Sequence, residues 1–237
     1  MITNEVCPYC LVIMVKAENL DNSRSVEHLI PNAALTRKRK NDEGDFYACR
    51  RCNSQKSKVD EVIGAMAKAQ SADSELAASA LIKLVTRHES LPARYARMLD
   101  SAQPDLDGVH VDMPLTGPEL IQYLTFLGKG AYFKKFKKPL RSSNQIMLID
   151  LHNKQILASF EQAYEAKHGT RPVRDLETNP RSEVIEPGQS VIWSKGTTFF
   201  IVLHDYLGIS IKVRPRNRKN ERRARTAANY LLQHFGH

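Results

Sequence analysis

The stretch that decides the fold is EHLIP at residues 27–31, followed by CRRCNSQK at residues 49–56. A third segment, CPYC at residues 7–10, precedes them, and together the three hold all four cysteines of the chain. An acidic residue and a histidine thus lie between two Cys-x-x-Cys pairs, and an asparagine directly follows the second pair. This combination predicts that metal ions organise the N-terminal part of the protein.

The four cysteines, Cys7, Cys10, Cys49 and Cys52, are predicted to bind one structural Zn²⁺. Each Cys-x-x-Cys pair presents two thiolates from one turn, and zinc prefers four such ligands in a tetrahedral arrangement. A site of this kind has no open position for water, and its binding energy adds to the folding energy of a small unit. Four reduced core cysteines are the alternative interpretation.

Composition and charge favour a polyanionic partner. Lys and Arg number 35 against 26 Asp and Glu, which gives a formal charge of +9 and a pI near 9.4. A basic surface gains free energy when it displaces counterions from nucleic-acid phosphates. No apolar run approaches the ~18 residues of a membrane span, and the polar, cysteine-bearing N-terminus is unlike a signal peptide. We therefore expect a cytoplasmic protein with reduced cysteines and no membrane association.

Glu27 and His28 are candidate catalytic residues. A carboxylate can hold a hard divalent cation through oxygen, and a neutral imidazole can take a proton from water. Neighbouring residues of a strand point to opposite faces, so the two share a site only where the strand bends, and Pro31 favours a bend there. A Glu-His dipeptide alone is not specific, and its significance depends on the surrounding pattern.

The order CxxC, acid-His-aliphatic-Ile-Pro, CxxC-Asn-x-x-Lys resembles the HNH endonuclease family, over residues 7 to about 58. The resemblance implies a ββα-metal unit, in which two strands and a helix surround one divalent ion, and metal-dependent hydrolysis of phosphodiester bonds. It makes Glu27 and Asn53 ligands of a catalytic Mg²⁺ or Mn²⁺, and His28 the base that activates water. Lys56 falls where the family carries a lysine near the nucleic-acid backbone.

The middle asparagine of the family motif has no obvious counterpart. Its position falls near Gly44 or Asp45, and Asn32 and Asn41 are both possible substitutes. Because the family uses this residue to tie the loop between the two strands, the choice affects the geometry of that loop.

The predicted fold class is α+β. Residues 1–60 are expected to form the HNH unit with its zinc knuckles, residues 61–115 a helical segment and linker, and residues 116–237 an α+β accessory or targeting domain. The linker is placed at 103–117, which is rich in glycine and proline.

The C-terminal part is predicted to contain an antiparallel three-stranded meander. Three β-rich runs, at 191–194, 198–204 and 208–213, are separated by short turns. Residues 153–168 are expected to form a helix and the polar residues 171–188 a loop. Trp193 is interpreted as a core residue.

Cationic segments are the predicted nucleic-acid contacts. Residues 37–40 could lie along a phosphate backbone or form an ordinary solvated loop. Residues 214–225 hold seven cations and one acid, which fits DNA or an acidic protein partner. For 129–138, where cations alternate with aromatics, we favour a core role over base stacking. The predicted contacts are Lys56, Lys58, Arg37, Lys38, Arg39, Lys40, Arg50, Arg51, Arg216, Arg218, Arg222 and Arg223.

The function expected from the sequence is a metal-dependent HNH endonuclease that acts on DNA, such as a bacterial or phage defence or mobile-element nuclease. Two alternatives remain open: an HNH nuclease that cleaves RNA, and a non-catalytic, zinc-bound nucleic-acid-binding adaptor. The C-terminal domain could also bind a protein partner.

Overall fold

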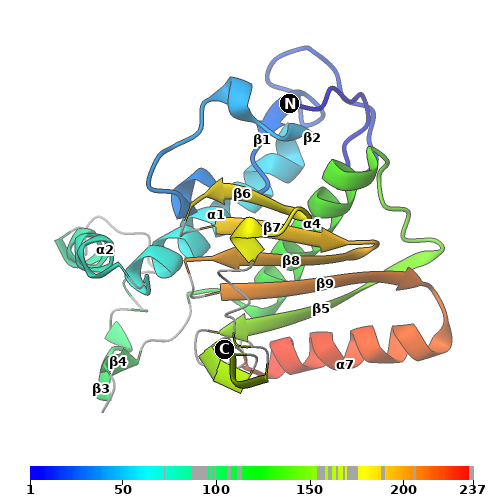
Figure 1. The fold of residues 1–237 in the computed structure, drawn as a ribbon. Helices are drawn as coiled ribbons and strands as arrows, with labels where there is room; N and C mark the ends of the chain where they lie inside the picture. Colours follow the sequence, from blue (N-terminus) through cyan, green and yellow to red (C-terminus); the bar gives the residue numbers. More distant parts are fainter. Residues whose placement is uncertain are drawn as a thin grey trace.

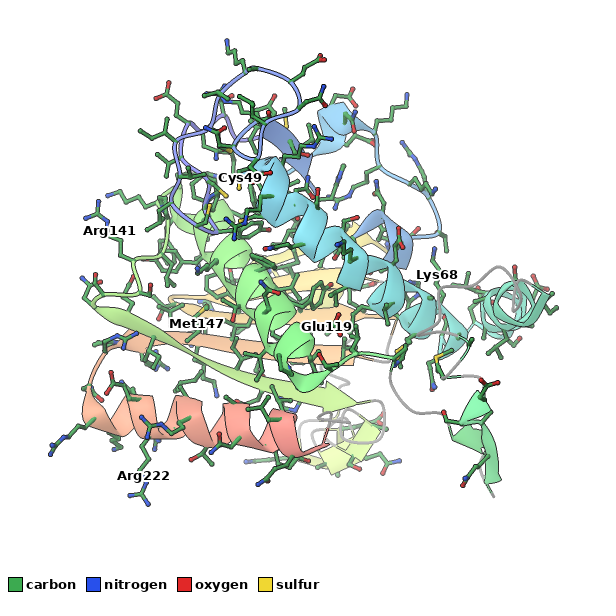
Figure 2. The ribbon with its side chains drawn as sticks, turned by 180° about the vertical axis from the view of Figure 1, so that it is seen from behind. Cys49, Lys68, Glu119, Arg141, Met147 and Arg222 are labelled. Carbon is green, nitrogen blue, oxygen red and sulfur yellow. The ribbon has the colours of Figure 1, made fainter. Side chains whose placement is uncertain are left out.

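The computed structural model describes residues 1–71, 73–86, 100–105, 108–110, 114–153, 176–187, 190–204 and 207–234, with short pieces at 96, 98, 158–159, 162–163, 165–167 and 169. It is a mixed α+β fold in which helices α1 and α4 lie behind a five-stranded antiparallel sheet (Figures 1 and 2). No helix in these described parts is long and apolar enough to cross a membrane.

A hairpin and a helix follow one another in the N-terminal part. Strand β1 (Arg24–Glu27) pairs antiparallel with β2 (Phe46–Cys49), and Glu27 lies opposite Phe46. Helix α1 (Arg50–Ala69) starts directly after β2, with Cys49 at its N-cap. The intervening loop contains two short 3₁₀ turns, η1 (Asn32–Ala34) and η2 (Asn41–Glu43). At Gly64 the backbone of Ala33 lies so near that a Cβ would come within 2.4 Å of it, which lets η1 pack tightly on α1.

The large sheet has five strands in the order β5-β9-β8-β7-β6, and each neighbouring pair is antiparallel. The three β-rich runs expected from the sequence coincide with the strands β7 (Ser190–Lys195), β8 (Thr198–Leu203) and β9 (Leu207–Pro215). Two further strands, β5 (Gln145–Asn153) and β6 (Ser182–Glu186), complete the sheet at its edges.

The prediction of a loop throughout 171–188 is therefore wrong where β6 forms. An edge strand needs one pairing partner and tolerates polar side chains toward solvent, so SEVIE could not be distinguished from a loop by hydrophobicity. The linker expected at 103–117 likewise contains a short hairpin, β3 (Gln103–Asp105) with β4 (Gly108–His110). Of the helix expected at 153–168, the described pieces 158–159, 162–163 and 165–167 are helical, Asn153 ends β5, and the other residues lie outside the described parts.

One continuous core joins the N-terminal and C-terminal parts. Its largest cluster of buried residues includes Leu29 and Ile63 as well as Leu124 and Ile211. The predicted boundary between 60 and 61 falls inside α1, which runs without interruption to Ala69. No break in the fold occurs at this boundary. Helix α2 (Ser74–Thr86) follows α1.

Helix α4 (Gly117–Phe136) connects the sheet to the hairpin. A capping box between Thr116 and Glu119 and a proline in the first turn define its start. Phe126 and Phe133 pack in a second buried cluster with Cys7, Tyr9 and Phe46, so the core role favoured for the aromatic residues is confirmed for Phe133. Helix α7 (Arg218–His234) packs against β5 and α4. Trp193, expected in the core, is only half-buried.

Candidate functional site

The four cysteine sulfurs converge next to the start of α1. All four lie within 4.8 Å of one another, and the Sγ atoms of Cys10 and Cys49 are 3.6 Å apart. A regular tetrahedron with Zn–S distances of ~2.3 Å has sulfur–sulfur distances of about 3.8 Å. Cys7, Cys49 and Cys52 are buried, whereas Cys10 is exposed. These residues could hold a structural metal ion such as zinc.

The electrostatics of the thiols favour a bound cation. A hydrogen bond from the Cys52 thiol lowers the pKa of Cys7 to about 5. Burial raises the pKa of Cys49 to about 11, and the interaction with Cys7 raises the pKa of Cys52 well above its ordinary value. The negative charge of the Cys7 thiolate thus raises the pKa of the neighbouring thiols. A divalent cation bound between the four sulfurs would lower these pKa values again.

His28 lies directly after β1 and is half-buried. Its Nε2 is 3.0 Å from the carbonyl oxygen of Lys40, so the carbonyl fixes the tautomer with Nε2 protonated. Among the described residues Nδ1 has no hydrogen-bond partner, which leaves it as the acceptor. Burial lowers the pKa of His28, so the imidazole is neutral near pH 7. The Lys40 carbonyl therefore holds the imidazole in one orientation, and the lowered pKa favours its uncharged form.

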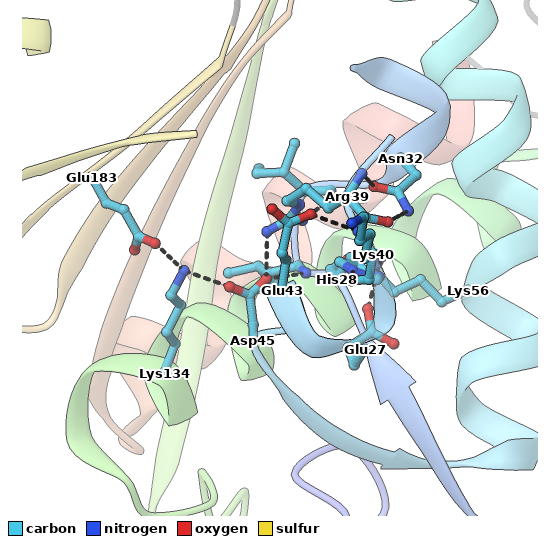
Figure 3. Close-up of polar contacts among 12 residues, drawn as sticks. Glu27, His28, Asn32, Arg39, Lys40, Glu43, Asp45, Lys56, Lys134 and Glu183 are labelled. Carbon is cyan, nitrogen blue, oxygen red and sulfur yellow. Dashed lines mark hydrogen bonds and ion pairs between the residues drawn. The ribbon is translucent and has the colours of Figure 1, made fainter. Parts of the chain in front are cut away.

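The loop that carries Lys40 is tied by Asn32, Arg39 and Asp45 (Figure 3). The Asn32 side chain accepts from the backbone N–H of Arg39 at 2.9 Å and donates to its carbonyl oxygen at 3.0 Å. The Arg39 guanidinium turns inward, where it donates to the carbonyl oxygen of Ile30 and pairs with Asp45. Of the two candidate asparagines, Asn32 ties the loop in this structure. Arg39 has a structural role here, against its prediction as a nucleic-acid contact.

Asp45 and Glu186 fasten this loop to the rest of the fold. Asp45 accepts a hydrogen bond from the backbone N–H of Leu29 at 2.7 Å, and it forms an ion pair with Lys134 of α4 at 2.7 Å. Lys134 also pairs with Glu183 on β6 (Figure 3). Glu186 at the end of β6 accepts from the backbone N–H of Thr36 at 3.0 Å. No motif marked these acidic residues, because their partners are distant in sequence.

Glu27 points into the core and faces Lys56. The carboxylate is 1% exposed, and its Oε1 lies 3.0 Å from Lys56 Nζ, which is itself fully buried. Lys56 also pairs with Asp60 at 2.8 Å. In this structure Glu27, predicted as a ligand of the catalytic ion, is buried against Lys56, and Lys56, predicted as a nucleic-acid contact, is itself buried. The alternation of β1 sends Glu27 inward, where Glu27 and Asp60 share the single ammonium group of Lys56.

Asn53 lies in the second turn of α1 and reaches back to β1. Its Nδ2 donates to the hydroxyl of Ser25 at 2.6 Å and to the carbonyl oxygen of Val26 at 2.8 Å. Outside the four cysteines, no group of three His, Cys, Asp or Glu side chains in the described parts of the chain is close enough to hold an ion. Asn53 therefore contacts β1 on the face that Ser25 shares with Glu27, whereas His28 is directed to the Lys40 carbonyl, so the structure shows no contact among Glu27, His28 and Asn53.

No known protein family, curated protein or solved structure matches the chain. What the protein does must be inferred from its own residues. The sequence pointed to the cysteines, His28 and Asn53, but missed Asp45, Lys134 and Asp60. Only Asp60 had a local signal, because it follows Lys56 at the i,i+4 spacing of a helical ion pair.

We expect the stability of the fold to fall with rising pH because of Glu27. Burial raises the pKa of Glu27 from 4.5 to about 7, and Asp60 adds to this shift although Lys56 opposes it. The folded state then binds the proton more tightly than the unfolded state, so this stabilisation is complete below pH 4.5 and lost as pH rises through 7. Between pH 6 and 8 the free energy of unfolding of wild type should fall by about 1 kcal/mol relative to Glu27→Gln, measured in urea with zinc present. Parallel pH profiles for the two proteins would contradict this.

Proposed function

We propose that the protein is a metal-dependent HNH-type endonuclease that hydrolyses phosphodiester bonds, with DNA favoured over RNA. The observation that carries the proposal is the state of His28: a neutral imidazole, oriented by the Lys40 carbonyl, with Nδ1 available. It stands at the end of the first strand of a hairpin-helix unit whose strands and helix meet at four clustered cysteines. The resemblance of the sequence to the HNH family is its second support.

In the proposed reaction His28 Nδ1 takes a proton from a water molecule, and the resulting hydroxide attacks the phosphorus. A bound Mg²⁺ or Mn²⁺ would supply charge neutralisation at the phosphate and the leaving oxygen. The side-chain oxygen of Asn53 is the protein ligand left for such an ion, because Glu27 is paired with Lys56. Mg²⁺ commonly keeps several waters and substrate oxygens as ligands, so few protein ligands suffice.

Cations around this strand end would contact the substrate backbone. Lys38 and Lys40 are exposed on the loop, and Arg51 and Lys58 are exposed on α1. Two other predicted contacts are partly engaged: Arg37 pairs with Glu43, and Arg50 donates to the Asn19 side chain. All lie on the elements that bear His28 and Asn53.

Replacing His28 tests the proposal. We expect His28→Ala to lower the rate of plasmid nicking in Mg²⁺ or Mn²⁺ by a factor of about 10²–10⁴, because the base is lost while the fold remains. The wild-type rate should rise with pH through a pKa below 6.5, since burial lowers the pKa of His28. Gel assays of supercoiled DNA measure both effects.

The exposed loop residue Asn41 provides the matched control, and Asn41→Ala should nick at the wild-type rate. Chelation of the catalytic ion should stop cleavage, with zinc content measured on the same sample so that loss of the structural ion is recognised. Unchanged nicking by His28→Ala would refute the catalytic assignment. A parallel RNA panel decides between the two substrates.

The burial of Glu27 favours one competing function, a non-catalytic zinc-bound adaptor that binds nucleic acid. Its carboxylate is neutralised by Lys56 and is closed to solvent. In that case the purified protein binds DNA but does not cut it under any divalent-ion condition, and the His28→Ala variant behaves as wild type.

A further inference from the structure

A basic groove lies between α7 and the β5–β9 edge of the sheet. Its volume is about 1610 Å³, and β9 and α7 supply its cationic walls. Figure 2 shows Arg222 directed away from the body of the molecule on α7. The cations that line the groove are Lys212, Arg214, Arg218, Lys219, Arg222, Arg223 and Arg225. Among the described residues, the acidic ones that line it are Asp150 and Glu221.

Within the described parts of the chain, these cations have no carboxylate partner. Glu221 pairs with Arg216, and among the described residues none of the seven lining cations forms an ion pair within 4.0 Å. In an ordinary solvated helix face, charges of both signs alternate and support one another at i,i+4 spacing. Here Arg218 and Arg222, and likewise Lys219 and Arg223, place like charges at that spacing.

The charge of α7 also opposes its helix dipole. Arg218, Lys219, Arg222 and Arg223 lie in the first turns, next to the positive end of the helix, with Glu221 as the acidic residue there. Like-charge pairs and cations at a helix N-terminus both destabilise a helix, each by a few tenths of a kcal/mol. A bound anion would neutralise these cations and remove both unfavourable effects on α7.

The geometry of α7 fits an extended anion. Arg218, Arg222, Thr226 and Tyr230 follow one another at four-residue spacing and all line the groove. The helix has 17 residues and is therefore about 25 Å long. Tyr230 is 58% exposed and presents an aromatic ring at the far end of this row. Leu231, which follows Tyr230 and also lines the groove, packs α7 into the main core cluster.

The groove is separate from His28. Glu186 of β6, at one edge of the sheet, binds Thr36 of the His28 loop, whereas the groove is lined by residues of β5, at the other edge. Figure 1 shows β6 and β5 at opposite edges of the sheet. Four strand spacings of ~4.8 Å separate these edges, roughly 19 Å. A duplex rises 3.4 Å per base pair, so this separation corresponds to about six base pairs.

We propose that the groove between α7 and the β5–β9 edge binds the sugar–phosphate backbone of a nucleic acid, at a site distinct from His28. The unpaired guanidinium and ammonium groups on two walls complement a row of phosphates. The centre of a protein–protein interface is usually apolar and poor in charged residues. The groove instead carries seven cations along its length, so it is less suited to a protein partner. The groove and the His28 site would bind the same kind of partner, a nucleic acid, but binding in the groove does not require cleavage.

The test is DNA binding by the variant Arg218→Ala/Arg222→Ala, prepared with His28→Ala so that no cleavage occurs. The probe is a fluorescein-labelled 20-base-pair duplex, followed by anisotropy between 50 and 200 mM salt without added divalent ions. We expect affinity to fall about tenfold or more near 100 mM salt, and the slope of log K against log salt to decrease by about 2. Alanine is the best helix former, so α7 should persist, and circular dichroism checks this.

The matched control is Lys16→Ala/Lys195→Ala, which removes the same charge from two exposed residues outside the groove. It should keep the wild-type salt slope. The variant Arg218→Lys/Arg222→Lys, which retains the charges, should keep most of the affinity.

If Arg218→Ala/Arg222→Ala and the control Lys16→Ala/Lys195→Ala lower DNA affinity equally, the proposal is overturned, because the loss would then reflect only the lower net charge of the protein. Unchanged DNA affinity in Arg218→Ala/Arg222→Ala would also overturn it. If poly-glutamate binds the wild type as tightly as DNA does, and this variant loses affinity for both equally, the groove is instead a site for acidic proteins. Intact cleavage by His28→Ala alone would refute the nuclease proposal and leave the groove proposal standing.

Discussion

Removal of zinc is expected to unfold the N-terminal part of the chain. Before β1, residues 1–23 form no strand or helix, and the isolated bridge between Ile2 and Phe46 joins them to β2. Their buried cluster includes Cys7, Cys49 and Cys52, whose sulfurs the ion would connect. Structural zinc sites contribute about 10–16 kcal/mol of binding free energy in small units, so this segment should not persist without the ion.

Cys49→Ser should reproduce this loss, because it removes a buried ligand at the start of α1. The wild type should contain about one zinc per chain, and the variant should bind less zinc, melt at a lower temperature and be cleaved by protease within residues 1–45. Ser57→Ala, on the exposed side of the same helix, is the control and should retain zinc. A wild-type protein that is fully folded with no bound zinc would disprove the assignment.

Loss of the Lys56 ammonium is expected to destabilise the whole fold. Lys56→Met keeps an unbranched side chain one atom shorter but leaves Glu27 and Asp60 in the core without a cation. Breaking a buried ion pair by removing one partner costs about 3–5 kcal/mol. Urea unfolding at pH 7.5 in saturating zinc measures the change.

The control is Lys58→Met, two residues along α1 on its exposed face, which should change stability by no more than about 0.5 kcal/mol. The triple variant Lys56→Met/Glu27→Gln/Asp60→Asn should recover much of the loss, because no uncompensated charge is then buried. Equal effects of Lys56→Met and Lys58→Met would show that the buried pairs contribute nothing.

Local spacing explains which features could be predicted from the sequence. Each Cys-x-x-Cys pair lies in one local turn of the backbone: Cys7 and Cys10 in a turn near the N-terminus, and Cys49 and Cys52 at the start of α1. The spacing within each pair therefore predicted that its two sulfurs lie close together. The β-rich runs at β7, β8 and β9 were found because alternating apolar residues and short turns are encoded within a few residues. The α+β class follows from the same patterns.

Features that depend on distant partners could not be predicted. Strand periodicity places Glu27 and His28 on opposite faces, but only the packing of α1 and α4 decides that Glu27 is the buried one. The choice of Asn32 over Asn41 depends on where Arg39 turns, and β6 depends on an unpaired edge of β7.

By itself the sequence determined the clustering of the cysteines and the cationic character of α7. The tertiary structure decided what each residue can touch. It enclosed Lys56 between two carboxylates, tied the His28 loop to β6, and placed α7 beside β5 and β9 so that their cations form one groove. The physical reason is that burial, ion pairing and grooves arise from contacts between segments far apart in the chain, which no local pattern encodes.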